Sequence, residues 1–308
     1  MKDSVTIKKV IIIGVRGFIG SHLKTYLENK GYHVYGADVV VDYVAKNYFL
    51  IDATNGGFES VFREQAFDLC INCSGAASVP DSIRNPRRDY YLNTSNVFSL
   101  LNAIRDRQPN CRFINLSSAA VYGNPTSLPV AEEAIPRPLS PYGYHKYMSE
   151  TICREFYEQF GLATCSLRIF SAYGEGLTKQ IFWDLYQKSK AKRKVELFGS
   201  GNETRDFIYV LDLVRLIELI AIHGEFHGEA VNAASGIETS IRSAAETFFS
   251  YYPDPPQIRF TQTERQGDPS RWVADISKIK ENYNYSPEFT LEEGLRRYYQ
   301  WVQQKEKQ

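Results

Sequence analysis

The stretch that decides the fold is Lys8-Lys-Val-Ile-Ile-Ile13, followed directly by Gly14-Val-Arg-Gly17-Phe-Ile-Gly20. The β-branched apolar run is typical of a strand that is buried on both faces. The pattern after the glycines predicts a helix up to about Lys30, and residues 32–38 predict a second strand. A glycine-rich turn between a strand and a helix lets backbone amides and the helix N-terminus face a pyrophosphate. The stretch therefore predicts a dinucleotide-binding turn, against the alternative that the glycines only let the helix pack closely on the strand.

Two charged residues near this turn bear on which dinucleotide would bind. Asp38 ends the second predicted strand, where a carboxylate suits the ribose diol of NAD and repels the 2′-phosphate of NADP. Arg16 lies inside the turn, and its guanidinium could pair with that phosphate. We favour NAD over NADP because the acid lies where the ribose must lie. The alternative for Asp38 is a solvated acid at the end of a strand.

The chain up to about residue 170 alternates predicted strands and helices. Further strands are expected at residues 47–51, 67–73, 111–116 and 162–170, with helices at 57–66, within 80–107 and from 140 onward. This alternation predicts an α/β fold, a Rossmann-type doubly wound parallel sheet, with a smaller mixed C-terminal substrate lobe. We assign residues 1–170 to the NAD-binding domain and residues 171–308 mainly to the lobe, with some of its segments returning to the main sheet. Ligands bind at the carboxyl ends of such strands, where we expect Gly14, Asp38, Ser74, Ser118 and Ser171.

Length, charge and cysteine content restrict the class of protein. The chain of 308 residues can bury a sizeable core, and its 36 basic and 36 acidic residues give no reason to expect a nucleic-acid or membrane partner. No apolar run approaches the roughly 20 residues of a membrane span, and the polar N-terminus does not resemble a signal peptide. The five cysteines fit a reducing compartment, so we expect a cytoplasmic protein. Cys70 and Cys73 form a C-x-x-C pair inside a predicted buried strand; we interpret them as small apolar side chains and expect no metal site.

A tyrosine and a lysine lie four residues apart in Tyr142-Gly-Tyr-His-Lys146. Because Ser140-Pro141 is typical of a helix start, the two side chains are expected one turn apart on the same face. A lysine charge there can favour tyrosinate and lower a phenol pKa from its usual value of about 10. Tyr142 is therefore a candidate proton carrier, with Tyr144 as a rival that lacks a lysine at this spacing. The alternative is that the pair has no catalytic role and consists of an exposed lysine beside a packed tyrosine.

Several motifs together resemble the extended short-chain dehydrogenase/reductase family, in particular its NAD-dependent nucleotide-sugar epimerases and dehydratases. Tyr142-x-x-x-Lys146 matches the family's Y-x-x-x-K pair, and residues 14–20 resemble its cofactor loop. Ser117-Ser-Ala-Ala-Val-Tyr-Gly123 is similar to its S-S-x-x-V-Y-G segment. Residues 205–210 are similar to its R-D-[FY]-I-x-V segment, and residues 265–268 resemble its R-x-G-D turn. The resemblance covers nearly the whole chain.

The resemblance implies a role for each matching residue. Ser118 would orient the reacting sugar oxygen, Tyr142 would take the proton from the 4-hydroxyl as hydride leaves C4, and Lys146 would hold the nicotinamide ribose. The cofactor-binding residues expected are Gly14, Gly17, Phe18, Ile19, Gly20, Asp38, Asp52, Ala53, Ser74, Asn96, Tyr142 and Lys146. The substrate-binding residues expected are Ser118, Ser171, Arg205, Arg265, Asp268 and Trp272. Guanidinium groups match phosphate oxygens, so the two arginines would grip the diphosphate; ion pairing with Asp206 and Glu264 is their alternative.

The residues after Ser118 bear on what happens to the 4-keto sugar. Dehydratases that resemble this chain carry an Asp-Glu pair there, and related decarboxylases keep a Glu. This chain has Ala119 and Ala120, which cannot transfer protons, so an elimination would need Glu132, Glu175 or His145 from elsewhere. We therefore expect a nucleotide-sugar 4-epimerase for a UDP-hexose such as UDP-glucose or UDP-galactose. The alternatives are a 4-ketoreductase or a dehydratase of the same family and, more remotely, a catalytically silent NAD-binding sensor.

Two finer expectations follow from the resemblance. Trp272 predicts a tight pocket that takes non-acetylated hexoses. A homodimer is expected through a four-helix bundle, formed by the helix that carries Tyr142 and the helix near residues 95–107. The apolar stripes of these helices are explained equally well by core packing.

Overall fold

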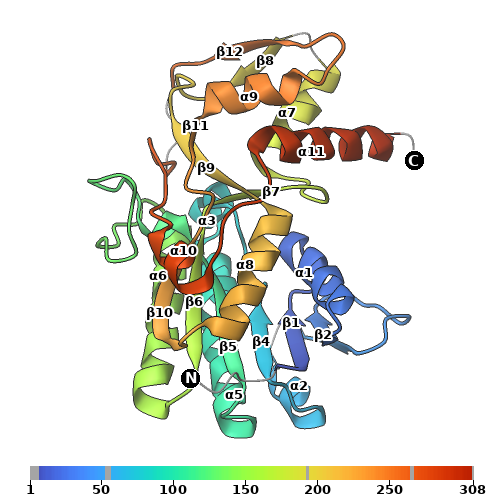
Figure 1. Ribbon diagram of the computed structural model, residues 1–308, viewed down its shortest axis with the longest axis vertical. Coiled ribbons are helices and arrows are strands. Elements are labelled where there is room, and N and C mark those ends of the chain that lie inside the picture. The colour runs from blue at the N-terminus through green and yellow to red at the C-terminus, as the bar shows by residue number, and fades with distance from the viewer. Residues whose placement is uncertain (1–6, 53–56, 192–193, 264–266, 307–308) are drawn as a thin grey trace.

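The computed structural model describes residues 7–52, 57–191, 194–263 and 267–306 (Figure 1). Within these residues the largest sheet has seven strands in the order β10–β6–β5–β4–β1–β2–β3, and every neighbouring pair is parallel. The strands are β1 (Lys9–Ile13), β2 (His33–Asp38), β3 (Tyr48–Leu50), β4 (Leu69–Asn72), β5 (Arg112–Ser118), β6 (Thr164–Ile169) and β10 (His227–Ala233). The predicted Rossmann-type doubly wound parallel sheet is confirmed.

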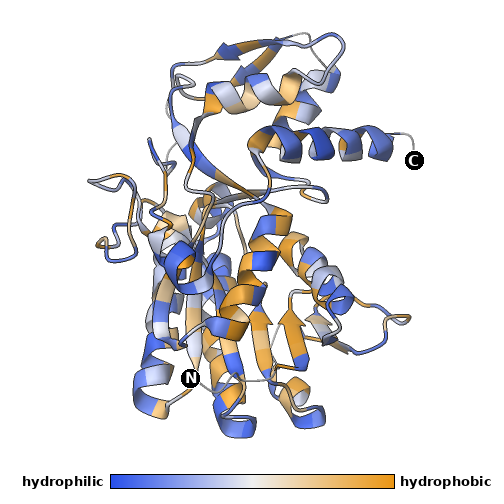
Figure 2. Ribbon diagram, in the orientation of Figure 1, coloured by the Kyte–Doolittle hydropathy of each residue, from blue (hydrophilic) through white to orange (hydrophobic). Residues whose placement is uncertain are grey.

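The composition of β1 explains why helices cover both faces of the sheet. Side chains alternate between the two faces of a strand, so an uninterrupted apolar run buries both. Val10 and Ile12 pack in one cluster with α1 (Phe18–Asn29) and α8 (Val210–His223). Ile11 and Ile13 pack in a second cluster with the helices of the opposite face, which are α2 (Glu59–Glu64), α5 (Asn96–Arg107) and α6 (Pro141–Phe160). Figure 2 shows the apolar colour concentrated on the central strands and α8.

The start of α6 follows from local chemistry that the sequence makes visible. The Ser140 hydroxyl accepts a hydrogen bond from the Gly143 amide at 3.2 Å, and Pro141 occupies the first turn. The helix ends at Gly161, whose φ of 70° is the left-handed conformation that glycine adopts without strain. The predicted helix is confirmed, and its first turn points to the carboxyl end of β5.

The segment before α5 is more divided than expected. The sequence predicts one or two helical stretches within residues 80–107. The structure has α3 (Val79–Arg84), α4 (Pro86–Tyr90) and a π-helical turn (Tyr91–Ser95) that leads into α5. A π-helical turn holds one more residue per hydrogen-bonded ring than an α-helix, so it changes which side chains face inward.

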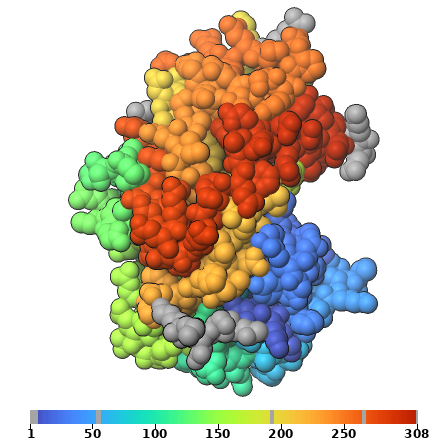
Figure 3. Space-filling view, viewed as in Figure 1, coloured from blue at the N-terminus to red at the C-terminus, as the bar shows by residue number. Residues whose placement is uncertain are grey.

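The C-terminal part forms a separate lobe above the sheet (Figures 1 and 3). Its described strands are β7 (Ser171–Tyr173), β9 (Thr204–Tyr209) and β11 (Glu238–Ser240), which form a mixed sheet, and the parallel pair β8 (Lys194–Leu197) and β12 (Gln257–Phe260). Its helices α7 (Gln180–Ala191), α9 (Ile241–Phe249) and α11 (Leu291–Glu306) pack around an aromatic core. By contrast, β10, α8 and α10 (Ser277–Tyr283) belong to the main sheet and its covering layer. A division of the chain at residue 170 remains our proposal.

Two features of this part were not predicted. β9 begins at Thr204, where no strand was predicted, and its register is fixed by β7 and β11 on either side. No strand was predicted at β10, although some segments after residue 170 were expected to return to the main sheet. In the described part of the chain, no helix is both long and apolar enough to cross a membrane.

Candidate active site

The end of β5 and the first turn of α6 bring three predicted catalytic residues together. Ser118 is the last residue of β5, and its hydroxyl accepts a hydrogen bond from the Ala120 amide at 3.2 Å. The phenol of Tyr142, in the first turn of α6, lies within the influence of the Ser118 side chain, which favours its ionised form. One turn further on, the Nζ of Lys146 donates to the Leu116 carbonyl at 2.8 Å. A hydroxyl, a phenol and an ammonium group therefore share one corner of the fold.

Burial dominates the electrostatics of this corner. Lys146 is only 5% exposed, and burial lowers the pKa of Lys146 from 10.5 to about 8, although Asp89 and Glu150 act in the opposite direction. Burial likewise raises the pKa of Tyr142 from 10.0 to about 12, with the Ser118 hydrogen bond opposing that rise. The lowered tyrosine pKa expected from the sequence is therefore not found, because removal of the phenolate from water outweighs its favourable partners.

An asparagine that the sequence analysis did not select lies beside Lys146. Gly75 has a φ of 117°, and a Cβ built there would lie 2.5 Å from Asn93 Oδ1 and 3.5 Å from Lys146 Nζ. Asn93 donates from Nδ2 to the Ala76 carbonyl at 3.1 Å, while its buried Oδ1 has no hydrogen-bond partner among the described residues. This acceptor and the ammonium group therefore both lie next to Gly75, where a ligand could contact the two. Asn96, the residue named from the resemblance, begins α5 and is half-buried.

The glycine turn has the geometry that a pyrophosphate requires. Gly14 has a φ of 78°, and a Cβ there would lie 2.7 Å from the Ser74 amide nitrogen. A Cβ on Gly20 would lie 2.3 Å from the Gly14 carbonyl oxygen, so only glycine fits without movement. α1 begins after Gly17 with no side-chain cap and no acid in its first turn, which leaves its first amides free for an anion. These residues therefore fit a dinucleotide.

The remaining predicted cofactor residues surround this turn. Phe18 and Ile19 form the first turn of α1, and Asp38 ends β2 with its Oδ2 accepting from the Arg16 amide at 2.8 Å. Ser74 follows β4, and Asp52 follows β3. Ala53 lies outside the described residues.

The substrate residues expected from the C-terminal lobe lie at its junction with the sheet. The Arg205 guanidinium lies 5.5 Å from the Trp272 ring and 4.0 Å from the Asp268 carboxylate. Trp272 Nε1 donates to the Gly123 carbonyl at 2.8 Å, which ties the lobe to the segment that follows Ser118. Ser171 begins β7, next to β9, whereas Arg265 lies outside the described residues.

The neighbouring acid Asp206 is not the partner of Arg205. Its buried carboxylate accepts hydrogen bonds from the Ser235 amide and hydroxyl and from the amides of Gly236 and Ala274. Asp206 therefore organises backbone turns, and the Arg205 guanidinium donates instead to the Thr204 carbonyl at 2.8 Å.

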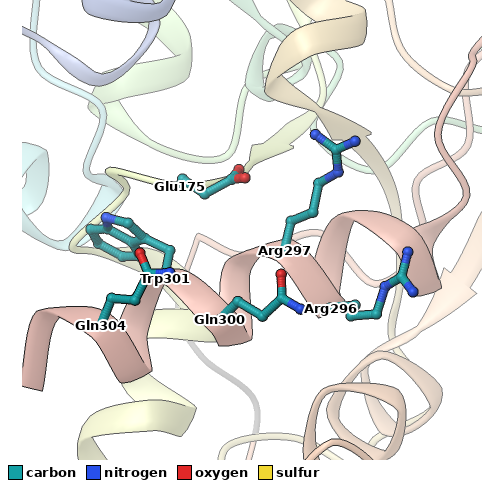
Figure 4. Close-up of a pocket in the computed structure, with 6 residues that line it drawn as sticks. All are labelled: Glu175, Arg296, Arg297, Gln300, Trp301 and Gln304. Carbon is teal, nitrogen blue, oxygen red and sulfur yellow. The ribbon is translucent and has the colours of Figure 1, made fainter.

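Each acid or base that could replace a dehydratase pair has a partner elsewhere. Glu132 accepts from the Asn232 amide at 2.9 Å, and His145 Nδ1 lies 2.6 Å from the Asp89 carboxylate. Glu175 accepts from the Tyr209 hydroxyl at 2.6 Å and faces a cavity of about 550 Å³ beside α11 (Figure 4). That cavity is lined by Glu175, Arg296, Arg297, Gln300, Trp301 and Gln304, and by none of the predicted catalytic residues.

Comparison with known proteins agrees with this geometry. The model of the NAD dependent epimerase/dehydratase family matches residues 10–234. The chain belongs to this family. The predicted family, the NAD-dependent enzyme class and the NAD cofactor are thereby confirmed.

Three relatives show how far the likeness within the NAD-dependent epimerase/dehydratase family extends. A UDP-glucose 4-epimerase from Azospirillum brasilense is 28% identical over 93% of this chain and 89% of its own length. A GDP-6-deoxy-D-mannose reductase from Pseudomonas aeruginosa is 27% identical over 94% of this chain and 95% of its own length. The crystal structure of UDP-glucuronic acid 4-epimerase from Bacillus cereus, in complex with UDP-glucuronic acid and NAD, superposes with a TM-score of 0.87. Its identity is 26%, over 96% of this chain and 99% of that one.

These relatives differ in their sugars and in one case in their reaction. Membership of the NAD-dependent epimerase/dehydratase family therefore fixes the fold and the cofactor, but not the substrate. In the described part of the chain, no group of three or more His, Cys, Asp or Glu side chains is arranged to hold a metal ion.

Proposed function

We propose that this chain is an NAD-dependent nucleotide-sugar 4-epimerase that oxidises C4 of a UDP-hexose and reduces it again from the other face. The observation that carries the proposal is the meeting of Ser118, Tyr142 and Lys146 with two buried alanines, Ala119 and Ala120, next to the serine. An epimerisation at C4 needs one reversible proton carrier, whereas an elimination needs further acids and bases.

The cofactor would lie along the carboxyl ends of the strands. The turn from Gly14 to Gly20 and the N-terminus of α1 would hold its pyrophosphate, and Asp38 its adenosine ribose. Lys146, with the unsatisfied Oδ1 of Asn93 beside it, would hold the nicotinamide ribose. When bound, NAD⁺ supplies the two-electron acceptor for the hydrogen at C4.

Proton transfer falls to Tyr142. Its phenol is protonated at neutral pH, since its pKa is about 12. The ammonium group of Lys146, joined by the positive charge of an oxidised nicotinamide ring, favours the phenolate, which then accepts the 4-hydroxyl proton. The Ser118 hydroxyl orients the same oxygen. The reverse transfer returns the proton from Tyr142 to the sugar after the ketone has turned over.

The diphosphate would stay in place while the sugar turns. Arg205 is 13% exposed and lies against Trp272, so its guanidinium has a fixed position and can bind two phosphate oxygens. Arg265 would be the second cation. Trp272 packs edge-on against Phe170 at 6.1 Å, which supports a narrow sugar pocket and favours a non-acetylated hexose.

The test is incubation of the purified protein with UDP-glucose, UDP-glucuronic acid and UDP-N-acetylglucosamine in turn, with the anomeric signals followed by NMR. We expect UDP-glucose to equilibrate with UDP-galactose without net change in NAD. Tyr142→Phe is the matched control: it should bind NAD and lose turnover. If no UDP-hexose is interconverted, the proposal is wrong.

A 4-ketoreductase is the second candidate, because a reductase is among the relatives with similar identity. A reductase consumes one reduced cofactor per product, whereas an epimerase regenerates its own. Stoichiometric oxidation of NADH or NADPH in the presence of a 4-keto nucleotide sugar, without epimerisation, would favour this candidate.

We further propose that the protein is a homodimer through α5 and α6. Large apolar side chains are exposed on the surface formed by α4, the π-helical turn, α5 and α6, namely Tyr90, Tyr91, Phe98, Tyr144, Tyr147 and Met148. Sedimentation analysis of wild type and Tyr147→Glu should give a dimer and a monomer, respectively. Tyr43→Glu is the control, since Tyr43 is also exposed but lies on the loop after β2.

A further inference from the structure

The loop that connects β2 to β3 folds back onto the glycine turn. The carboxylate of Asp38 accepts the Arg16 amide at 2.8 Å through Oδ2 and the Val39 amide at 2.7 Å through Oδ1. The backbone of Arg16 is therefore fixed beside the acid that marks the ribose position. Its side chain therefore begins beside Asp38, where we expect the adenosine ribose of a bound dinucleotide.

The Arg16 side chain does not point freely into that place. Its guanidinium forms an ion pair with Asp42 and lies 5.7 Å from the centre of the Tyr48 ring. The ring is fixed in turn, because the Tyr48 hydroxyl donates to the Val40 carbonyl. The guanidinium thus has a partner on the loop.

The carboxylate of Asp42 is itself held in place by hydrogen bonds. Its Oδ1 accepts hydrogen bonds from the amides of Val44 and Ala45, both at 3.0 Å, which leaves Oδ2 for the arginine. The Asp42 side chain is 15% exposed, whereas that of Arg16 is 46% exposed. The turn therefore presents a fixed carboxylate to the arginine.

From these contacts we propose that Asp42 is a second determinant of cofactor choice, acting by holding Arg16 away from the 2′-phosphate of NADP. This inference rests on the proposed function, which uses NAD at this site. A 2′-phosphate carries about −1.5 to −2 charges and needs a nearby cation. Asp38 repels it directly, and Asp42 withdraws the one cation of the glycine turn that could compensate. The ribose hydroxyls of NAD carry no charge, so the same ion pair has little effect on them.

The prediction is a change in selectivity and not a general change in affinity. Asp42→Asn keeps an oxygen for the amides of Val44 and Ala45 and removes the charge that holds Arg16. A guanidinium released toward a phosphate forms a charge-assisted hydrogen bond, so we expect NADP⁺ to bind about tenfold more tightly. The affinity for NAD⁺ should change by less than about threefold.

The experiment measures dissociation constants of NAD⁺ and NADP⁺ by calorimetry on protein stripped of bound nucleotide. It compares wild type, Asp42→Asn, Arg16→Gln and the double variant. The gain for NADP⁺ should appear in Asp42→Asn and vanish when Arg16→Gln is added. Asp42→Ser, whose hydroxyl can still accept from the backbone amides, should reproduce the gain if the turn itself is intact. Asp106→Asn, an exposed acid on α5, is the control for net charge.

The outcomes separate this inference from the function on which it rests. An unchanged ratio of the two dissociation constants in both Asp42 variants, or a gain that persists without Arg16, would overturn the role of Asp42 while leaving the epimerase intact. A wild-type protein that binds neither dinucleotide would overturn the proposed function, and the role of Asp42 with it.

Discussion

Replacement of Lys146 by methionine should make the cofactor-free protein more stable while it abolishes catalysis. The two side chains have similar length, but only the lysine is charged. Lys146 is 5% exposed, and its pKa is lowered from 10.5 to about 8. The fold therefore disfavours the charged form, and at pH 7 the group is charged in both the folded and the unfolded protein.

The magnitude follows from the difference between the two pKa values. That difference corresponds to about 3 kcal/mol of destabilisation of the folded protein at pH 7, since one pKa unit corresponds to about 1.36 kcal/mol. The variant also loses the hydrogen bond from Lys146 to the Leu116 carbonyl, which costs about 1 kcal/mol. We expect Lys146→Met to raise the free energy of unfolding by about 2 kcal/mol at pH 7.

The sign of the pH dependence distinguishes this cause from better packing. Between about pH 8 and pH 10.5 the folded wild type releases the proton while the unfolded chain keeps it, so wild-type stability rises through this range. The advantage of Lys146→Met should therefore be complete below pH 8 and decline above it. If better packing of the methionine were the cause, the stability difference between the two proteins would not depend on pH.

Urea unfolding of cofactor-free wild type and Lys146→Met at pH 7 and pH 9.5 measures both quantities. Lys280→Met is the control, because Lys280 is an exposed lysine on α10 and its replacement removes a charge without relieving burial. A variant that is less stable than wild type at pH 7 would refute the reasoning. So would a difference that is the same at both pH values.

Three further predictions concern the cofactor and sugar sites. Gly20→Ala places a methyl group 2.3 Å from the Gly14 carbonyl oxygen, so thermal unfolding should show a loss of about 1–3 kcal/mol, and calorimetry a loss of NAD binding. Unchanged NAD affinity would argue against the glycine turn as the pyrophosphate site. Asn93→Ala should weaken NAD binding about tenfold while Asn96→Ala leaves it nearly unchanged, because the free Oδ1 at position 93 lies beside the active-site lysine; the reverse order would restore the original assignment. Trp272→Ala should raise kcat/KM for UDP-N-acetylglucosamine relative to UDP-glucose by about tenfold, or more if the indole alone closes the pocket. An unchanged ratio in competition assays would place the size limit elsewhere.

The parts of the fold that the sequence predicts are those determined by neighbours along the chain. The Val10–Ile13 run alternates between two clusters, and Ser140 caps the helix that it precedes. In both cases a few adjacent residues contain the whole physical cause. The same holds for Gly20, whose close contacts are with Gly14 and Val15 in the same turn, whereas Gly14 is restricted by Cys73 and Ser74 after β4.

Asn93 shows what such patterns do not contain. Asn93 lies just before α5 and Asn96 begins it, and only the helical phase decides which of them lies next to Gly75. The π-helical turn at Tyr91–Ser95 shifts that phase, and it packs against α4 and α6. A regular α-helix would have been assumed from the sequence, so the choice between the two asparagines required the structure. The strand β10 was not predicted for a related reason, since Glu229 and Asn232 interrupt its apolar pattern.

Asn232 of β10 connects this edge strand to the residues around Ser118 and Lys146. Asn232 is completely buried and accepts the Tyr122 hydroxyl at 2.6 Å, and Tyr122 in turn accepts from Arg168 at 2.9 Å. Arg168 forms a buried ion pair with Glu150, which also accepts the Ser117 hydroxyl at 2.6 Å. This chain of contacts links β10, β6, α6 and β5 directly behind the catalytic serine and lysine. Removal of one member would leave a buried charge or dipole without its partner, at a cost of several kcal/mol. We infer that the network fixes the separation of Ser118 and Lys146, so β10 would support the proposed active site although it supplies no residue that reacts.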